Sequence, residues 1–187
     1  MNLEAINPIV YGAYLQRKAA GPRFYEPSTR EQLQEIEHMV DSRLPDDFVE
    51  FMLEYSTVAP TPKNNCGWFK VDYLDGAKLQ VNLSLVQWAK LIIRATEWYQ
   101  NPSPYNDEIG PRLPKTLLPL SRDDNASLLI DLRPKTFGNI LYHPDLSVWT
   151  FGTSMNDWDT IGYVAPNFTD MLKELNSEEV IKERYNL

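Results

Sequence analysis

The segment LPDDFVEFMLEY, residues 44–55, carries the clearest helix signal in the chain. Proline suits the first position of a helix, and Asp46 and Asp47 complement the positive end of the helix dipole. Glu50 and Glu54 stand one turn apart on the polar side. The apolar side chains recur at helical spacing on the other side: Phe48, Phe51, Met52 and Tyr55. The segment therefore predicts a helix that runs from the proline to about residue 55.

A second helix is predicted directly before this one. Ser28 and Glu31 have the spacing of a capping box. An apolar stripe follows at helical spacing: Leu33, Ile36 and Val40. After the pair, residues 57–65 contain two prolines and predict a loop. Residues 26–56 are therefore expected to form a helical hairpin, and residues 1–25 precede it as an N-terminal extension to which the sequence assigns no role.

Short strands are predicted for most of the region that follows. Residues 68–74 and 79–83 flank Asp75-Gly76, which is a strong signal for a β-hairpin. Five later segments are short, apolar or β-branched, and bounded by Gly, Pro or Asp: 117–120, 127–132, 140–142, 148–151 and 161–165. Together these segments predict a meandering sheet.

Two more helices are predicted, one within the strand region and one after it. Ser84 and Gln87 form a second capping box, and the apolar stripe behind it ends near Tyr99. Between this helix and the next strand, residues 101–114 are rich in Pro, Asn and Asp and predict a long loop. Asn167 caps the final helix. A further helical turn is expected around three apolar residues: Val180, Ile181 and Tyr185.

The order of these elements predicts an α+β fold. We expect a single domain over residues 26–187, with a mostly antiparallel or mixed sheet of short strands flanked by about four helices. A chain of 187 residues is long enough to bury a sizeable core without disulfides or metals. The side chains expected to meet in that core lie on the apolar stripes of their elements: Ile36, Phe48, Met52, Trp88, Ile92, Ile130, Phe168 and Leu172.

Cysteine usage and the N-terminal sequence indicate a cytoplasmic protein. The single cysteine, Cys66, cannot close an intrachain disulfide. The first residues place an acid before a short apolar patch and the cations after it, which is the reverse of a secretory signal. The longest apolar stretches fall far short of the ~20 residues that a membrane helix needs, so no membrane partner is expected.

The residues that could carry catalysis are few. His38 lies between polar neighbours and is expected to be a solvated surface residue. Cys66, His143 and Asp145 could be written as a catalytic triad, but no nucleophile elbow or family signature surrounds the cysteine. Two histidines and one cysteine cannot fill a structural zinc site, and no phosphate-binding or dinucleotide-binding glycine motif occurs. The sequence predicts a protein that is not an enzyme and has no cofactor or metal, with a cysteine hydrolase as the remote alternative.

Charge is more informative than catalytic chemistry. The net charge is −8, which argues against nucleic-acid binding and favours a neutral or basic partner. Residues 26–56 contain nine acids against two arginines, a net charge of −7 that nearly equals the charge of the whole chain. These acids fit the solvated faces of two amphipathic helices, and they also fit a surface that attracts a basic protein. The sequence leaves both interpretations open.

Further acids cluster at predicted turns together with aromatic residues. Aspartates in turns commonly accept backbone hydrogen bonds, but Trp158 between two aspartates has the pattern of an interface anchor with flanking charge. A partly buried core tryptophan explains the same residue. If a partner binds, the candidate contact residues are Glu50, Glu54, Tyr105, Asp123, Asp124, Asp157, Trp158 and Asp159.

Several of these segments together resemble a known family. The run Glu35-Ile36-Glu37, followed by the Leu-Pro-Asp-Asp-Phe motif at 44–48 and by Phe51-Met52, is similar to the N-terminal signature of the SUKH superfamily. The order of later segments, at 113–124, 128–132 and 164–172, also follows that family, and the likeness spans about residues 28 to 176. The chain departs from the pattern at 56–60, where members usually carry Asn-Gly-Gly, and at Asn125-Ala126, where a glycine is usual.

The resemblance implies a SUKH-like α+β fold with no catalytic residues. For bacterial members it implies immunity proteins that neutralise polymorphic toxins, many of them nucleases or deaminases, whereas fungal relatives regulate cell-wall assembly. We therefore expect a non-enzymatic immunity protein that occludes a basic toxin, with a scaffold or regulatory protein as the alternative. The sequence predicts neither the identity of the toxin nor the oligomeric state.

Overall fold

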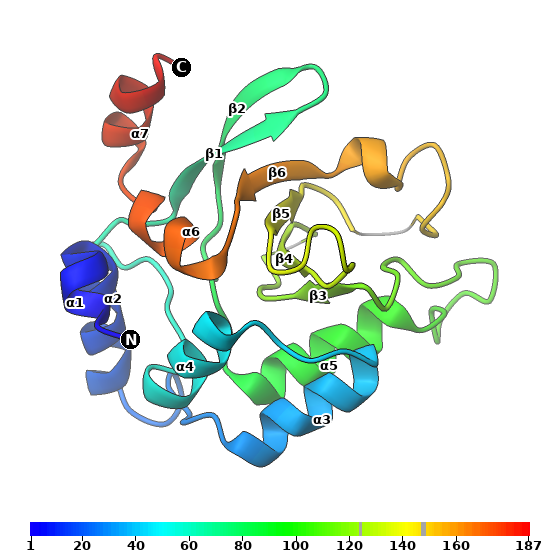
Figure 1. The fold of residues 1–187 in the computed structure, drawn as a ribbon, viewed down its shortest axis with the longest axis horizontal. Coiled ribbons are helices and arrows are strands. Elements are labelled where there is room, and N and C mark those ends of the chain that lie inside the picture. Colours follow the sequence, from blue (N-terminus) through cyan, green and yellow to red (C-terminus); the bar gives the residue numbers. More distant parts are fainter. Residues whose placement is uncertain (124, 147–148) are drawn as a thin grey trace.

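The sheet is the centre of the fold. The computed structural model describes residues 1–123, 125–146 and 149–187. Within them six strands form one sheet in the order β2-β1-β6-β5-β4-β3, and every neighbouring pair is antiparallel (Figure 1). This confirms the α+β fold expected from the sequence. The strands are β1 (Trp68–Tyr73), β2 (Gly76–Val81), β3 (Leu117–Pro119), β4 (Ser127–Asp131), β5 (Ile140–His143) and β6 (Gly162–Ala165).

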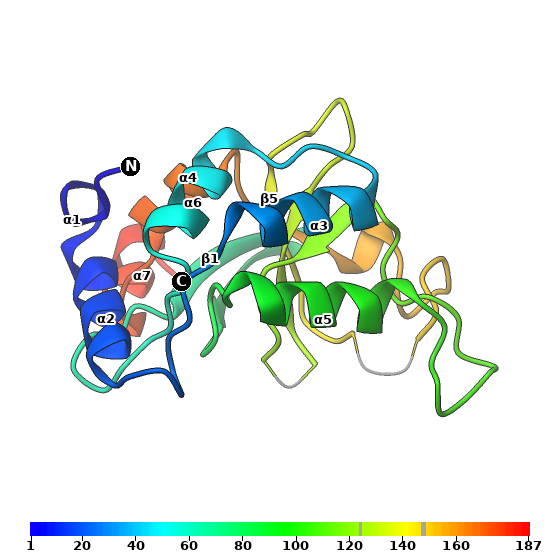
Figure 2. The same ribbon diagram turned by 90° about the horizontal axis from the view of Figure 1, so that it is seen from below.

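Helices surround this sheet. The described residues contain α1 (Leu3–Ile6), α2 (Pro8–Ala19), α3 (Arg30–Val40), α4 (Asp46–Glu54), α5 (Ala89–Gln100), α6 (Phe168–Glu174) and α7 (Glu178–Tyr185), and one 3₁₀ turn, η1 (Trp158–Thr160). The four helices predicted between residues 28 and 175 correspond to α3, α4, α5 and α6. Both views show α3 and α5 side by side, and Figure 1 shows them below the sheet (Figures 1 and 2).

The main core lies where the helices meet the sheet. Phe168 of α6 packs edge-on against Phe48 and Phe51 of α4, with ring centroids 5.2 and 5.0 Å apart. Seven of the eight predicted core residues are buried together here: Ile36, Phe48, Met52, Ile92, Ile130, Phe168 and Leu172. Trp88 was predicted wrongly, because it is half-buried at the N-cap of α5 and does not lie on the buried stripe of that helix.

The sheet is buried on both faces in its second half. Leu128 and Ile130 of β4 face the main core, while Leu129 between them faces a second, smaller core. The same alternation places Leu141 of β5 in the second core, together with Leu117 of β3. This period-2 alternation explains why β4 is apolar without interruption.

Two predicted capping boxes are wrong, and tertiary contacts explain both. At α3 the cap is Thr29, which forms the reciprocal box with Gln32. Ser28 is buried instead, and its hydroxyl bonds to the Ser56 hydroxyl at 2.6 Å and accepts from the Ala89 amide at 3.1 Å. That amide is the first of α5, so the neighbouring serine serves the N-terminus of a distant helix.

The start of α5 is also later than predicted. The Ser84 hydroxyl donates to the Arg122 carbonyl, and Asn82 accepts from the amides of Ser84 and Leu85. Residues 84–88 are therefore not helical, Val86 forms an isolated antiparallel bridge with Val58, and the helix begins at Ala89. The predicted strand at 148–151 is a further correction in part: residue 148 lies outside the described residues, and 149–151 form no strand. The long loop predicted at 101–114 contains neither helix nor strand.

Residues 1–25 pack against the rest of the fold. α1 and α2 bury four side chains in the main core: Leu3, Val10, Ala13 and Tyr14. The Asn7 amide group, between the two helices, donates to the carbonyls of Leu172 and Leu175 at 2.8 Å each. On the other side of α2, Tyr14 packs edge-on against Tyr55 and Tyr25. The two N-terminal helices are thus tied to both α6 and α4.

Candidate functional site

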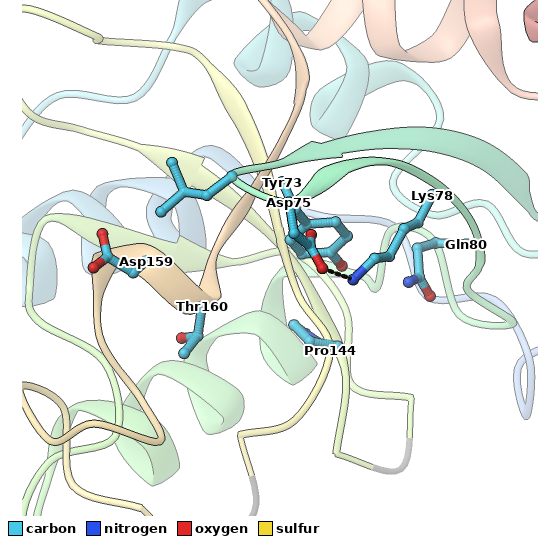
Figure 3. A pocket seen from close by; sticks show the side chains of 8 residues that line it. Tyr73, Asp75, Lys78, Gln80, Pro144, Asp159 and Thr160 are labelled. Atoms are coloured by element: carbon cyan, nitrogen blue, oxygen red, sulfur yellow. Dashed lines mark hydrogen bonds and ion pairs between the residues drawn. The ribbon is translucent and has the colours of Figure 1, made fainter.

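A groove lies between the β1–β2 hairpin and η1. One part of it, about 440 Å³, is lined from the hairpin by Tyr73, Leu74, Asp75, Lys78 and Gln80, and from the other side by Pro144, Asp159 and Thr160 (Figure 3). A second part, about 330 Å³, shares the first two of these and continues over Asp72, Arg133, Leu141, Trp158, Ile161 and Tyr163. Strand alternation places the first part on the face of the hairpin that carries Lys78 and the second on the face that carries Asp72, and the two meet at Tyr73 and Leu74. We call the residues that line either part the hairpin groove.

A glycine at the start of β6 allows the groove to form. A Cβ at Gly162 would lie 2.1 Å from Val71 Cγ1 and 2.8 Å from Tyr73 Cε1. Since Tyr73 lies in the groove wall, any side chain at this position would displace both β1 and that wall. The absence of a side chain therefore lets β6 approach the hairpin, to which it pairs through Asp72 and Tyr163.

The aromatic anchor of the groove is held by an arginine. The Arg133 guanidinium lies 3.7 Å from the centroid of the Trp158 ring, and Phe151 packs edge-on against the same ring at 5.3 Å. Asp131, which is fully buried, accepts two Arg133 Nε–H contacts at 3.0 and 3.1 Å and one from a terminal nitrogen at 2.6 Å. A bidentate pair of this kind fixes the guanidinium plane, so Trp158 rests on a rigid support. These hydrogen bonds also raise the pKa of Arg133.

The rim of the groove is apolar and acidic. Leu74 at the hairpin tip is 80% exposed, and Trp158 and Tyr163 are each 38% exposed. Asp159 is exposed beside them, and Asp75 pairs with Lys78 at 2.6 Å (Figure 3). Exposed aromatic and aliphatic side chains with acids around them are suited to a protein partner that carries basic residues.

A buried polar group lies in the wall of the groove. The Tyr73 hydroxyl is buried and, among the described residues, has no hydrogen-bond partner. Burial also raises the pKa of this phenol, so the group stays protonated and can donate a hydrogen bond.

The predicted contact residues occupy several places. Trp158 and Asp159 line the hairpin groove. Asp157 caps η1 by accepting from the Asp159 amide at 2.9 Å, and Asp123 accepts from the Leu83 amide at 2.6 Å. Both carboxylates therefore have local structural roles as well. Asp124 lies outside the described residues.

The remaining predicted contact residues lie elsewhere on the molecule. Glu50 and Glu54 of α4 form ion pairs with the terminal ammonium group of Met1, the second at 3.3 Å. Tyr105 is 86% exposed in the 101–114 loop and packs on Trp98 with ring centroids 5.7 Å apart. In both ribbon views α4 lies on the left of the molecule, and η1 and this loop lie on the right (Figures 1 and 2).

Sequence reasoning missed the residues that complete the groove. Arg133 follows Asp131 at the end of β4, where the spacing of two lets one arginine fold back onto the carboxylate, and that local pattern could have suggested the pair. Leu74 at an exposed hairpin tip was a second available signal. Their meeting with Trp158 depends on the order of strands in the sheet, which no local pattern encodes.

The residues of the hypothetical hydrolase have other contacts. Cys66 is fully buried, and burial raises the pKa of its thiol to about 12, which suppresses the thiolate. His143 is buried too. Its Nε2 lies 2.9 Å from Asn156 Oδ1, and its Nδ1 accepts from the Asp145 amide at 3.0 Å. Because that amide can only donate, the imidazole is neutral with the proton on Nε2, and burial lowers its pKa.

Two further findings concern the described part of the chain. No group of three or more His, Cys, Asp or Glu side chains there could hold a metal ion. No helix there has both the length and the apolar character needed to cross a membrane.

Comparison with known proteins identifies one family. Residues 27–174 match the SMI1 / KNR4 family (SUKH-1), which confirms the resemblance seen in the sequence. Comparisons with curated proteins and with solved structures give no match. The matched segment begins before α3 and ends with α6, and it includes the whole sheet. Since the match covers most of the chain and the observed α+β fold agrees with it, this protein belongs to the SMI1 / KNR4 family (SUKH-1).

Proposed function

We propose that this protein is an immunity protein that binds a basic toxin of the nuclease or deaminase type through the hairpin groove and occludes its active site. The observation that carries the proposal is the support of Trp158. Its ring is held against Arg133, Asp159 is exposed beside it, and Leu74 and Tyr163 are exposed around the same groove. Preorganised aromatic anchors dominate the binding energy of protein interfaces.

Charge supports a basic partner. Nuclease active sites are basic because they hold phosphates, so an acidic protein competes for the same cations. The chain carries a net charge of −8, and the groove rim adds Asp159 to the paired Asp72 and Asp75. Complementary charge of this kind raises association rates towards ~10⁸ M⁻¹s⁻¹ at low salt.

The proposal describes a binding protein without catalysis. Family membership supports this class, since the resemblance to SUKH proteins implies binding and immunity functions. The high pKa of the Cys66 thiol and the hydrogen bonds of His143 to Asn156 also favour it over a hydrolase. The proposal places the protein in the cytoplasm, where a single reduced cysteine is common.

Growth rescue tests this proposal. The reading frame beside this gene is expressed alone and together with the chain, and we expect growth arrest in the first case and rescue in the second. Trp158→Ala and Asp159→Lys should reduce rescue, whereas Tyr105→Ala, which changes a more exposed aromatic residue that does not line the hairpin groove, should leave it intact. Thermal melting of each variant controls for folding. A neighbour that is not toxic, or a chain that does not protect, would favour the scaffold or regulatory alternative.

Kinetic measurements on the protein and its purified toxin partner then distinguish the effect of charge on association from the effect of Trp158 on dissociation. We expect the association rate to fall as salt rises, and Asp159→Lys to slow association while Trp158→Ala speeds dissociation. Asp107→Lys is the matched control, because Asp107 is an exposed acid in the 101–114 loop. A rate that does not change with salt, together with unchanged binding by Asp159→Lys, would mean that this acid is only a surface residue.

A further inference from the structure

A second groove, bordered by basic rather than acidic residues, lies between the C-terminal end of α2 and the loop that follows α4. It has a volume of about 240 Å³ and is lined by Gln16, Arg17, Ala20, Phe24, Thr61 and Pro62. α2 and this loop are in direct contact, since a Cβ on Gly12 would lie 2.7 Å from Asn64 Oδ1. Figure 2 shows the same arrangement, with the loop passing beside α2. We call it the N-terminal groove.

The segments that line this groove carry cations and no acids. Residues 5–25 contain three cations and neither Asp nor Glu, and residues 55–67 contain Lys63 and likewise no acid. The other cations adjoin lining residues in the sequence: Lys18 follows Arg17, and Arg23 precedes Phe24. In the part of the chain that the structure describes, none of these four cations forms an ion pair with a carboxylate.

Arg17 is the least satisfied of the four cations. Its side chain is half-buried in the groove wall, and its Nε–H is buried without an acceptor among the described residues. Burial also lowers the pKa of its guanidinium, because the charged group is partly removed from water. No carboxylate among the described residues pairs with it to offset this effect. The position of Arg17 in the last turn of α2 suits the helix dipole. That position explains a cation there, but it leaves the Nε–H unpaired.

An apolar surface accompanies the charge. Phe24 is 42% exposed, and the Arg23 guanidinium lies 5.6 Å from its ring centroid. Ala20 and Pro62 complete the apolar lining. The groove therefore places the Arg17 guanidinium, which can donate two parallel hydrogen bonds, beside the Phe24 ring and Pro62. This combination suits a ligand with a carboxylate next to an apolar side chain.

We propose that the N-terminal groove docks an acidic segment of a protein partner, in which a carboxylate pairs with Arg17 and a neighbouring apolar side chain packs on Phe24 and Pro62. This surface is distinct from the hairpin groove and takes a partner of the opposite charge. A nucleic acid is disfavoured, because residues 26–56, with a net charge of −7, follow directly and would repel a phosphate backbone.

Selection from a library of random short peptides tests the proposal with the full chain. We expect the selected peptides to be acidic and to contain an aliphatic or aromatic residue. Affinity for a representative peptide should fall about tenfold or more in Arg17→Gln and in Phe24→Ala. Lys115→Gln is the matched control, since Lys115 is an exposed cation elsewhere, and it should bind as the parent does.

Four results would overturn the proposal. Selected peptides that are not acidic, or that bind Arg17→Gln as tightly as the parent, would remove the N-terminal groove as their site. Tighter binding of a single-stranded oligonucleotide than of any acidic peptide, lost in Arg17→Gln, would assign the surface to nucleic acid. Self-association in sedimentation experiments that Arg17→Gln abolishes would assign it to a second copy of the chain.

Discussion

The two halves of the sheet differ in what covers them. In β4 and β5 every residue is buried, because helices cover one face, and the C-terminal half of α5 covers the other together with loops around the second core. In the β1–β2 hairpin, β2 has no buried residue, and β1 buries only Phe69 and Val71 on one face. Strands buried on both faces stabilise a fold, whereas a hairpin with one open face leaves side chains free to bind a partner.

The two edges of the sheet repeat this contrast. β3 forms one edge with three residues and ends in Pro119, which has no amide to offer another strand. β2 forms the other edge with six residues and carries the exposed Lys78. Both edge strands therefore resist pairing with other chains, β3 because it is short and ends in proline, and β2 because it carries an exposed lysine. The β1–β2 hairpin differs from β3 in that its tip also lies beside η1. The contrast predicts large stability effects in the buried half and small ones in the hairpin.

The largest effect is expected in the main core. Phe48→Ala and Phe168→Ala should each lower the free energy of unfolding by about 3–5 kcal/mol, because each removes a fully buried ring. Their effects should not add, since the two rings are in contact. Urea denaturation measures both, with Leu74→Ala as the exposed control, expected within about 0.5 kcal/mol of the parent. Losses below about 1 kcal/mol at both phenylalanines would contradict the assigned core.

The junction of the two halves should give the next largest effect. Gly162→Ala should lower the free energy of unfolding by about 1–3 kcal/mol, because the new methyl group collides with Val71 and Tyr73. Combining it with Val71→Ala returns space, so the double variant should lose less stability than the sum of the two single variants. Simple additivity in the denaturation data would mean that β6 does not depend on close approach at this position.

The sequence predicted the elements that are locally determined. The stripe of Phe48, Phe51 and Met52 on α4 is buried as expected, and the Asp75-Gly76 signal lies at the hairpin turn. The exact caps could not be predicted, because Ser28 and Thr29 each have a helix-favourable partner three residues later. What separates them is tertiary: the Ser28 hydroxyl bonds to Ser56 and Ala89, which are distant in the sequence.

The candidate site shows the same limit. Trp158 and Asp159 were found from their own neighbourhood, as an aromatic residue between acids. Arg133 and Leu74 were not, because β4 and the hairpin tip meet η1 only after the sheet has assembled in its strand order. Local patterns therefore identify which residues suit an interface, and topology decides which of them share one.

The stability of the fold should fall at low pH because of a buried histidine that lies between β5 and η1. His143 of β5 lies 3.3 Å from the Thr160 hydroxyl of η1, and burial lowers its pKa in the folded state below the ordinary 6.5. Above that value neither state binds the proton. As the pH falls below about 6.5 the unfolded chain takes up a proton that the folded chain resists, so stability falls, by at most about 1.4 kcal/mol per pH unit.

Urea denaturation at about pH 7.5 and about pH 5 checks this expectation. His143→Gln should lose less stability than the parent on acidification, even if it is less stable at both values. An equal acid loss in His143→Gln and the parent would place the proton-linked destabilisation at other groups.

The smallest effect on stability is expected at the hairpin edge. Lys78 pairs with Asp75 at 2.6 Å, but the two side chains are 51% and 66% exposed, so water and salt screen the pair. Exposed pairs of this kind contribute about 0–1 kcal/mol, and Lys78→Ala should therefore change the free energy of unfolding by no more than about 0.5 kcal/mol. Denaturation at low and high salt measures this, and the difference between variant and parent should shrink as salt rises. A loss well above about 1 kcal/mol would mean that the hairpin tip helps to hold the fold, and the division between a structural half and a binding half of the sheet would then fail.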